Sequence, residues 1–125
     1  MIDVLIVEPN KLPYEKKIKN DLKTYQEIVD GMIETTGIIG DREILIVCND
    51  EGKNLNMPYN RDIGHDIIAG TFIIVGNDYE NLDFKSLTKE QIAKYKNKFN
   101  EKSIKDTEIK IIALAAKSIL RNYEI

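Results

Sequence analysis

A short apolar run near the start of the chain most constrains its fold. In residues 2–8, Val4 and Ile6 point to one face of an extended strand, while Leu5 and Val7 point to the other. A strand that is apolar on both faces needs cover on both sides. The run therefore predicts a central strand of a sheet that has other layers packed against it.

Two helices are predicted from apolar spacing and from end signals. Pro13 suits the first position of a helix, and an apolar stripe at steps of three and four residues extends it to Asp30, where Gly31 ends it. Thr88 and Gln91 have the spacing of a capping box. This box predicts that a second helix begins there and continues to about residue 100.

A third helix is expected from Asp106 or Thr107 to near the end of the chain. Its wide apolar face consists of Ile109, Ile112, Ala113, Ala116, Ile119 and Leu120. Such a helix buries this face in its own domain or against a partner, a homodimer being one alternative. Residues 107–123 are therefore treated as an addition to the domain.

Further strands are expected at residues 32–36, 43–48 and 67–75, with Gly70 marking a bulge or a close approach of another group. Residues 53–65 contain Pro58 and are expected to form a long loop with a short turn of helix near Arg61. The prediction is a single domain of the α+β class over residues 1–125. It has a mainly antiparallel sheet of about four strands and three helices.

Charge and composition narrow the classes of partner. The net charge of −3 arises from 18 basic and 21 acidic residues spread along the chain, with no basic block for nucleic-acid phosphates. No signal peptide is recognised, and no run approaches the roughly 20 apolar residues that span a bilayer. The single cysteine, Cys48, cannot form an internal disulfide. We expect a soluble cytoplasmic protein that binds neither nucleic acid nor membrane.

The lone histidine restricts the available chemistry. Any nucleophilic triad must use His65, while Cys48 lies in an apolar strand with no basic group to activate it. Asp62, His65 and Asp66 would share one turn of helix and have ligand types suited to a divalent metal, but a solvated loop is the favoured interpretation. No phosphate-binding loop is present. No catalytic residue, metal or cofactor is therefore predicted.

Polar residues concentrate between one apolar strand that ends near residue 48 and another that begins near residue 67. The predicted binding residues are Asn49, Glu51, Gly52, Asn60, Arg61 and Asp66. Arg61 has a planar fork suited to a carboxylate or phosphate group. The favoured interpretation of Arg61 is structural: it pairs with Asp62 or Asp66 and braces the loop.

Several strings in this region resemble a known family. These are residues 48–53 (CNDEGK), 58–61 (PYNR) and 66–76 (DIIAGTFIIVG), together with 8–11 (EPNK), 13–14 and 86–88. The chain is similar over residues 2–100 to domain of unknown function family 3846. The resemblance implies a small protein of bacterial phages, plasmids or conjugative elements. It also implies that Gly70 belongs with the predicted binding residues.

Three functions follow as alternatives. The first is a noncatalytic binding protein of a mobile genetic element, which recognises a small anionic ligand or a host protein through the loops at residues 49–52 and 60–66. The second is a small enzyme that uses Glu51 or Asp66 as general base and Arg61 as anion clamp. The third is a structural or assembly protein that acts through its C-terminal helix.

Overall fold

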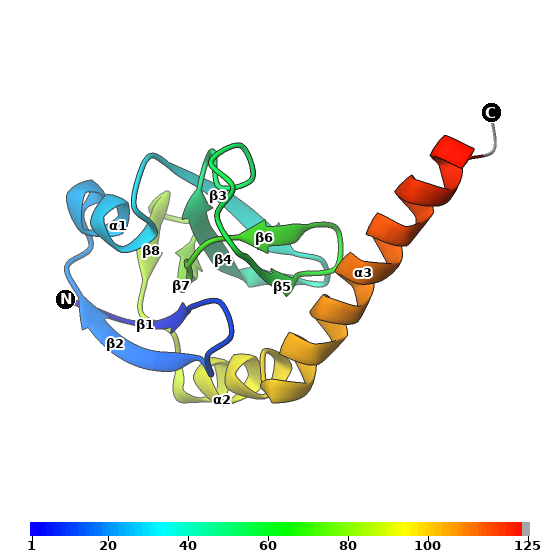
Figure 1. Ribbon diagram of the computed structural model, residues 1–125. Coiled ribbons are helices and arrows are strands. Elements are labelled where there is room, and N and C mark those ends of the chain that lie inside the picture. The colour runs from blue at the N-terminus through cyan, green and yellow to red at the C-terminus, as the bar shows by residue number, and fades with distance from the viewer. Residues whose placement is uncertain (124–125) are drawn as a thin grey trace.

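Antiparallel strands form the main sheet, and the computed structural model describes residues 1–123 of the chain (Figure 1). Five strands run in the order β2 (Tyr14–Ile18), β1 (Ile2–Val7), β7 (Phe72–Asp78), β4 (Asp41–Asn49) and β3 (Ile33–Ile38). A sixth, β8 (Asp83–Lys85), pairs with β7, and β5 (Tyr59–Asp62) and β6 (Ile67–Ala69) form a separate hairpin. The helices are α1 (Leu22–Val29), α2 (Lys89–Lys98) and α3 (Glu101–Tyr123). The predicted α+β class is confirmed, with more strands than the four expected.

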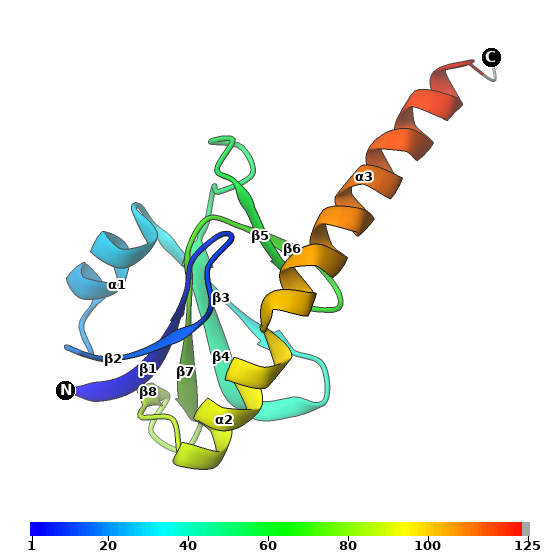
Figure 2. The same ribbon diagram turned by 60° about the horizontal axis from the view of Figure 1, so that its bottom comes forward.

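Each face of the main sheet has its own hydrophobic core. Val4 and Ile6 of β1 pack with α1, whereas Leu5 and Val7 pack with α2 and the β5–β6 hairpin. Figure 2 shows α1 and α2 on different sides of the sheet. The prediction that the first strand is interior and covered on both faces is confirmed, because β1 lies between β2 and β7.

The helix predicted over residues 13–30 is wrong in its first half. Residues 14–18 form the edge strand β2, which pairs antiparallel with β1 and exposes all but Ile18. Charged side chains on an edge strand discourage pairing with another chain. The helix begins after Asp21, whose side chain accepts a 2.8 Å hydrogen bond from the Thr24 N–H. Asp30 then takes a left-handed conformation at its end.

The segment between β4 and β7 differs most from the prediction. The expected loop contains β5 in place of a helical turn, so Arg61 lies in a strand. The single strand expected at residues 67–75 is divided at Gly70 into β6 and β7, which belong to different sheets. Gly70 has φ +84°, and a Cβ there would lie 2.8 Å from the Met57 sulfur. The close approach expected at this glycine is thus present.

The start of the second helix is confirmed. Thr88 accepts from the Gln91 N–H, and the Gln91 side chain accepts from the Thr88 N–H, which completes the capping box. Ile92, Tyr95 and Phe99 pack on the core as predicted. The third helix begins at Glu101, earlier than expected, because Asn100 caps it through its side-chain oxygen and the Ser103 N–H.

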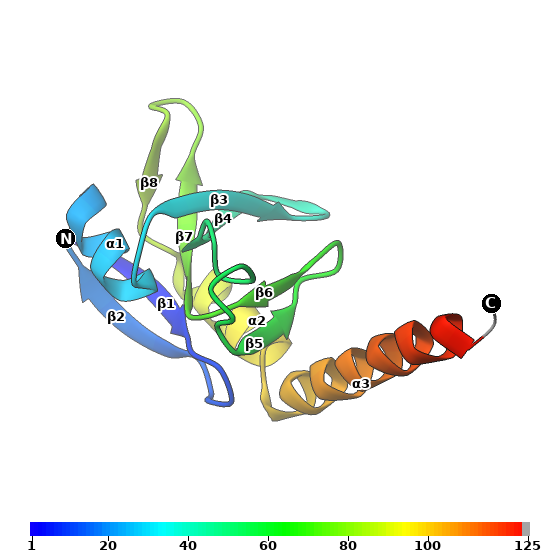
Figure 3. The same ribbon diagram turned by 45° about the horizontal axis from the view of Figure 1, so that its top comes forward.

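The apolar face of α3 is not buried in its own domain. Ile109, Ile112, Ile119 and Leu120 are each more than half exposed. Figure 3 shows the β5–β6 hairpin between the main sheet and the first turns of α3. Within residues 1–123, no helix has both the length and the apolarity needed to cross a membrane.

Candidate functional site

A polar pocket of about 220 Å³ lies where β3, β4, β6 and the turn after β4 meet. Its buried lining residues are Cys48, Asn49, Gly52, Ile67, Ile68 and Ala69. Exposed polar residues surround this lining, namely Glu34, Asp50, Glu51, Lys53, Asn54 and Asp66. The pocket therefore combines buried lining residues with charged residues that are exposed to solvent.

The turn after β4 is held in place by a buried amide. The Asn49 side chain donates hydrogen bonds of 3.1 Å to the carbonyls of Val29 and Asp30, at the end of α1. Its oxygen accepts from the Glu51 N–H at 2.8 Å. Asn49 is 5% exposed, so its polar groups serve the backbone and fix the rim residues that follow.

Gly52 closes the base of the pocket. A Cβ at this position would lie 2.6 Å from the backbone oxygen of Ala69, which is closer than real contacts allow. The turn can therefore approach β6 only because residue 52 lacks a side chain. Sequence reasoning selected this glycine, and the structure gives it a packing role.

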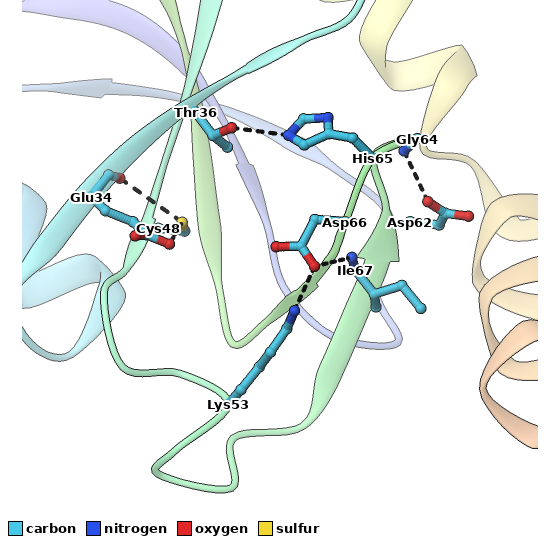
Figure 4. Close-up of polar contacts among 9 residues, drawn as sticks. All are labelled: Glu34, Thr36, Cys48, Lys53, Asp62, Gly64, His65, Asp66 and Ile67. Carbon is cyan, nitrogen blue, oxygen red and sulfur yellow. Dashed lines mark hydrogen bonds and ion pairs between the residues drawn. The ribbon is translucent and has the colours of Figure 1, made fainter. Parts of the chain in front are cut away.

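The rim carries a strong excess of negative charge. Glu34, Asp50, Glu51 and Asp66 are carboxylates, and Lys53 is the one basic residue among the lining residues. Lys53 Nζ donates to Asp66 Oδ1 at 2.5 Å, as Figure 4 shows. Partial burial by itself would raise the pKa of Asp66, but hydrogen bonds from Lys53 and the Ile67 N–H outweigh it, so the pKa is lowered. Asp66 is therefore ionised at neutral pH.

Cys48 contributes an unreactive thiol. Its sulfur lies 3.7 Å from the Glu34 carboxylate and 3.9 Å from the Glu34 carbonyl oxygen (Figure 4). Burial, followed by the neighbouring Glu34 charge, raises the pKa of the thiol to about 12. Because the thiolate is the nucleophilic form, Cys48 has no activation for covalent chemistry.

Asn60 and Arg61 lie outside the pocket and inside the protein. Arg61 is 0% exposed and donates to four neutral acceptors: Ser103 Oγ (3.0 Å), Asn60 Oδ1 (2.8 Å), Lys11 O (2.7 Å) and Phe99 O (3.1 Å). The Asn60 amide donates to the carbonyls of Val7 and Gly70 at 2.8 and 2.9 Å. We call Asn60 and Arg61 the internal brace, because together they join β1, β5 and the α2–α3 corner.

The internal brace explains how a buried guanidinium is tolerated. The Arg61 guanidinium donates to the Phe99 carbonyl at the C-terminal end of α2, where the helix dipole favours a cation. Desolvation nevertheless lowers the pKa of Arg61. The expected pairing of Arg61 with Asp62 or Asp66 is wrong, and its side chain is not accessible as an anion clamp.

The three residues considered for a metal site are directed apart. Asp62 accepts from Lys110 at 2.7 Å. Asp66 binds Lys53, and His65 lies 3.1 Å from Thr36 Oγ1 (Figure 4). A hydrogen bond from Lys110 lowers the pKa of Asp62 despite partial burial. Residues 1–123 contain no group of three or more His, Cys, Asp or Glu side chains arranged to hold a metal ion.

Four of the six predicted residues thus share one pocket, namely Asn49, Glu51, Gly52 and Asp66, whereas Asn60 and Arg61 do not reach it. Sequence reasoning missed Glu34, which faces Cys48 across the β3–β4 ladder. The register of the β3–β4 pair shifts between Thr36 and Ile38. A regular hairpin drawn from the sequence would therefore place a different residue opposite Cys48. Lys53 follows the predicted residue Gly52 in the sequence, but its ion pair with Asp66 forms only in the folded protein.

Comparison with known proteins identifies the family. Residues 2–100 match DUF3846, a domain of unknown function, and the chain belongs to this family. No curated protein and no solved structure matches the chain. The match ends at residue 100, and α3 begins at Glu101.

Proposed function

We propose that this member of the family is a noncatalytic binding protein whose pocket recognises a cationic group, such as a lysine or arginine side chain of a host protein. The observation that carries the proposal is the excess of carboxylates around the pocket. Four carboxylates face one ammonium in a concave site, so the local potential favours a positive ligand. A Lys or Arg side chain provides the donors that carboxylates accept.

The Lys53–Asp66 pair supports this choice of ligand. It shows that an ammonium group fits against Asp66 with good geometry. Both side chains are nearly half exposed, so the pair contributes little stability and an incoming cation can replace Lys53 at modest cost. The anionic ligand expected from the sequence depended on Arg61, whose guanidinium is fully buried.

A noncatalytic role fits the chemistry of the pocket better than an enzyme does. The thiol of Cys48 is held protonated, and the lowered pKa of Asp66 makes its carboxylate a weak base at neutral pH. We further propose that the protein acts in the cytoplasm as an accessory factor of a mobile genetic element. The mobile-element setting is what the resemblance of its central strings implies.

Titration monitored by backbone amide NMR tests the proposal. We expect methylammonium, methylguanidinium and an N-acetyl-arginine amide to shift the amide signals of Gly52 and Ala69, whereas acetate and phosphate do not. Glu34→Gln together with Asp66→Asn should weaken this binding about tenfold or more, since two charged acceptors are lost. Glu27→Gln changes an exposed carboxylate on α1, away from the pocket, and is the matched control.

Two results would contradict the proposal. One is binding of phosphate at the Gly52 and Ala69 signals in preference to the cations. The other is cation binding that is equally strong in wild type and in the doubly substituted protein.

A further inference from the structure

The second half of α3 has few contacts with the rest of the chain. Its first turns are held by Ser103, which accepts from Arg61, by Thr107, which accepts from the Asp62 N–H, and by Lys110, which pairs with Asp62. From residue 112 to 122 every side chain is exposed. Figures 1 and 2 both show α3 projecting away from the sheet.

The helix has two distinct sides. Ser103, Thr107, Lys110 and Leu114 recur at steps of four, three and four residues, and we call them the anchor side because the domain contacts lie there. The outer stripe consists of Ile109, Ile112, Ala116 and Ile119, at steps of three, four and three residues. On a helix of 3.6 residues per turn, these two sets lie on opposite sides.

The outer stripe has the spacing of a coiled-coil seam. Alternating steps of three and four place successive apolar side chains along one line of contact with another helix. Ile109, Ile112 and Ile119 are 66%, 68% and 57% exposed. A helix with so little tertiary contact is marginal in water, and its helical state needs a packing partner.

We propose that the outer stripe of α3 packs antiparallel against the outer stripe of a second copy of this chain, around a two-fold axis near the level of Leu114. Each pairing is then apolar. Ile109 lies opposite Ile119 of the second copy, and Ile112 lies opposite Ala116 of the second copy. Leu120, which is 61% exposed, flanks the seam.

The area buried and the antiparallel orientation of the two helices both support a second copy of this chain as the partner of the outer stripe. Pairing the two stripes with their flanking residues removes on the order of 1,000 Å² of surface, the lower limit for a specific interface. An antiparallel pair opposes the two helix dipoles. It also keeps the two domains apart, because each lies on the anchor side at its own helix start.

Light scattering coupled to size exclusion tests the interface. We expect a dimer for the intact wild-type chain at tens of micromolar, and Ile112→Glu should raise the dissociation constant about tenfold or more. Leu114→Glu is the matched control, since it adds the same charge on the anchor side of the same helix and should leave the dimer intact. Thermal melts confirm that both variants retain the folded domain.

Each other outcome overturns the proposal. A monomeric wild type excludes the dimer, and a dimer that survives Ile112→Glu or is lost with Leu114→Glu excludes the outer stripe. Cysteine cross-linking tests the direction, because Cys48 is buried and does not compete. Ala113→Cys should cross-link across the two-fold axis, whereas Ala116→Cys should not. A cross-link through position 116 alone would establish a parallel pair and overturn the antiparallel arrangement.

Discussion

The internal brace and the pocket rim place polar side chains from one stretch of the chain in opposite environments. Arg61 and Asp66 lie close together in the chain, and both looked like recognition groups in the sequence. Arg61 is fully buried and donates its hydrogen bonds to groups within the domain, whereas the Asp66 side chain is 46% exposed and faces a pocket. The comparison teaches that burial, and not residue type, decides whether a polar group is used up within the fold or stays accessible to a ligand.

The strongest test of this contrast replaces the buried cation. Arg61→Met keeps much of the side-chain volume but leaves the Asn60, Lys11 and Phe99 oxygens without their donor. We expect the free energy of unfolding to fall by about 3 kcal/mol or more, because buried acceptors lose their partners. Urea denaturation followed by circular dichroism measures this change.

The matched control is Arg121→Met, which changes an exposed arginine on α3. It should alter the unfolding free energy by less than about 0.5 kcal/mol. If Arg61→Met proved as mild as this control, the internal brace would not have the structural role assigned to it.

A smaller loss of stability is expected at the N-terminal end of α2, the helix whose C-terminal end the internal brace holds. Arg61 binds the last turn of α2, and Thr88 caps its first turn. Thr88→Ala removes the hydrogen bond to the Gln91 N–H and should cost about 1 kcal/mol. Thr88→Ser keeps the hydroxyl and should restore most of the loss, so equal melts for the two variants would contradict the capping role.

The smallest effect on stability is expected at the rim. The pKa of Asp66 is lowered from its ordinary value of 3.8, so the Lys53–Asp66 pair stabilises the fold at neutral pH. This contribution is lost as pH falls through the folded-state pKa, which lies below 3.8. Because both groups are exposed, Asp66→Asn should cost less than about 1 kcal/mol at pH 7.

Denaturation of wild type and Asp66→Asn at several pH values measures this difference. The stability gap should close as the solution is acidified below the folded-state pKa. A gap that widens on acidification would mean that Asp66 is not held ionised by Lys53.

Local patterns predicted several parts of the fold correctly. The capping box at Thr88 and the two-faced run of β1 depend on residues near each other in sequence, and both are present. The apolar stripe predicted for the first helix was correct only in part, because Tyr25 and Val29 are buried in α1 but Leu22 is 56% exposed. Such features can be read from sequence because hydrogen bonds within a turn and side-chain periodicity need no distant partner.

The sequence alone therefore determined the α+β class, the start of α2, the interior position of β1 and part of the pocket lining, including Glu51 and Asp66. Only tertiary structure decided that Tyr14–Ile18 forms an edge strand on β1, and that Glu34 faces Cys48. It also decided the role of Arg61, because three of its four acceptors belong to residues distant in the chain, namely Lys11, Phe99 and Ser103. A side chain's role follows from what surrounds it once folded, and those neighbours are set by the packing of the whole domain.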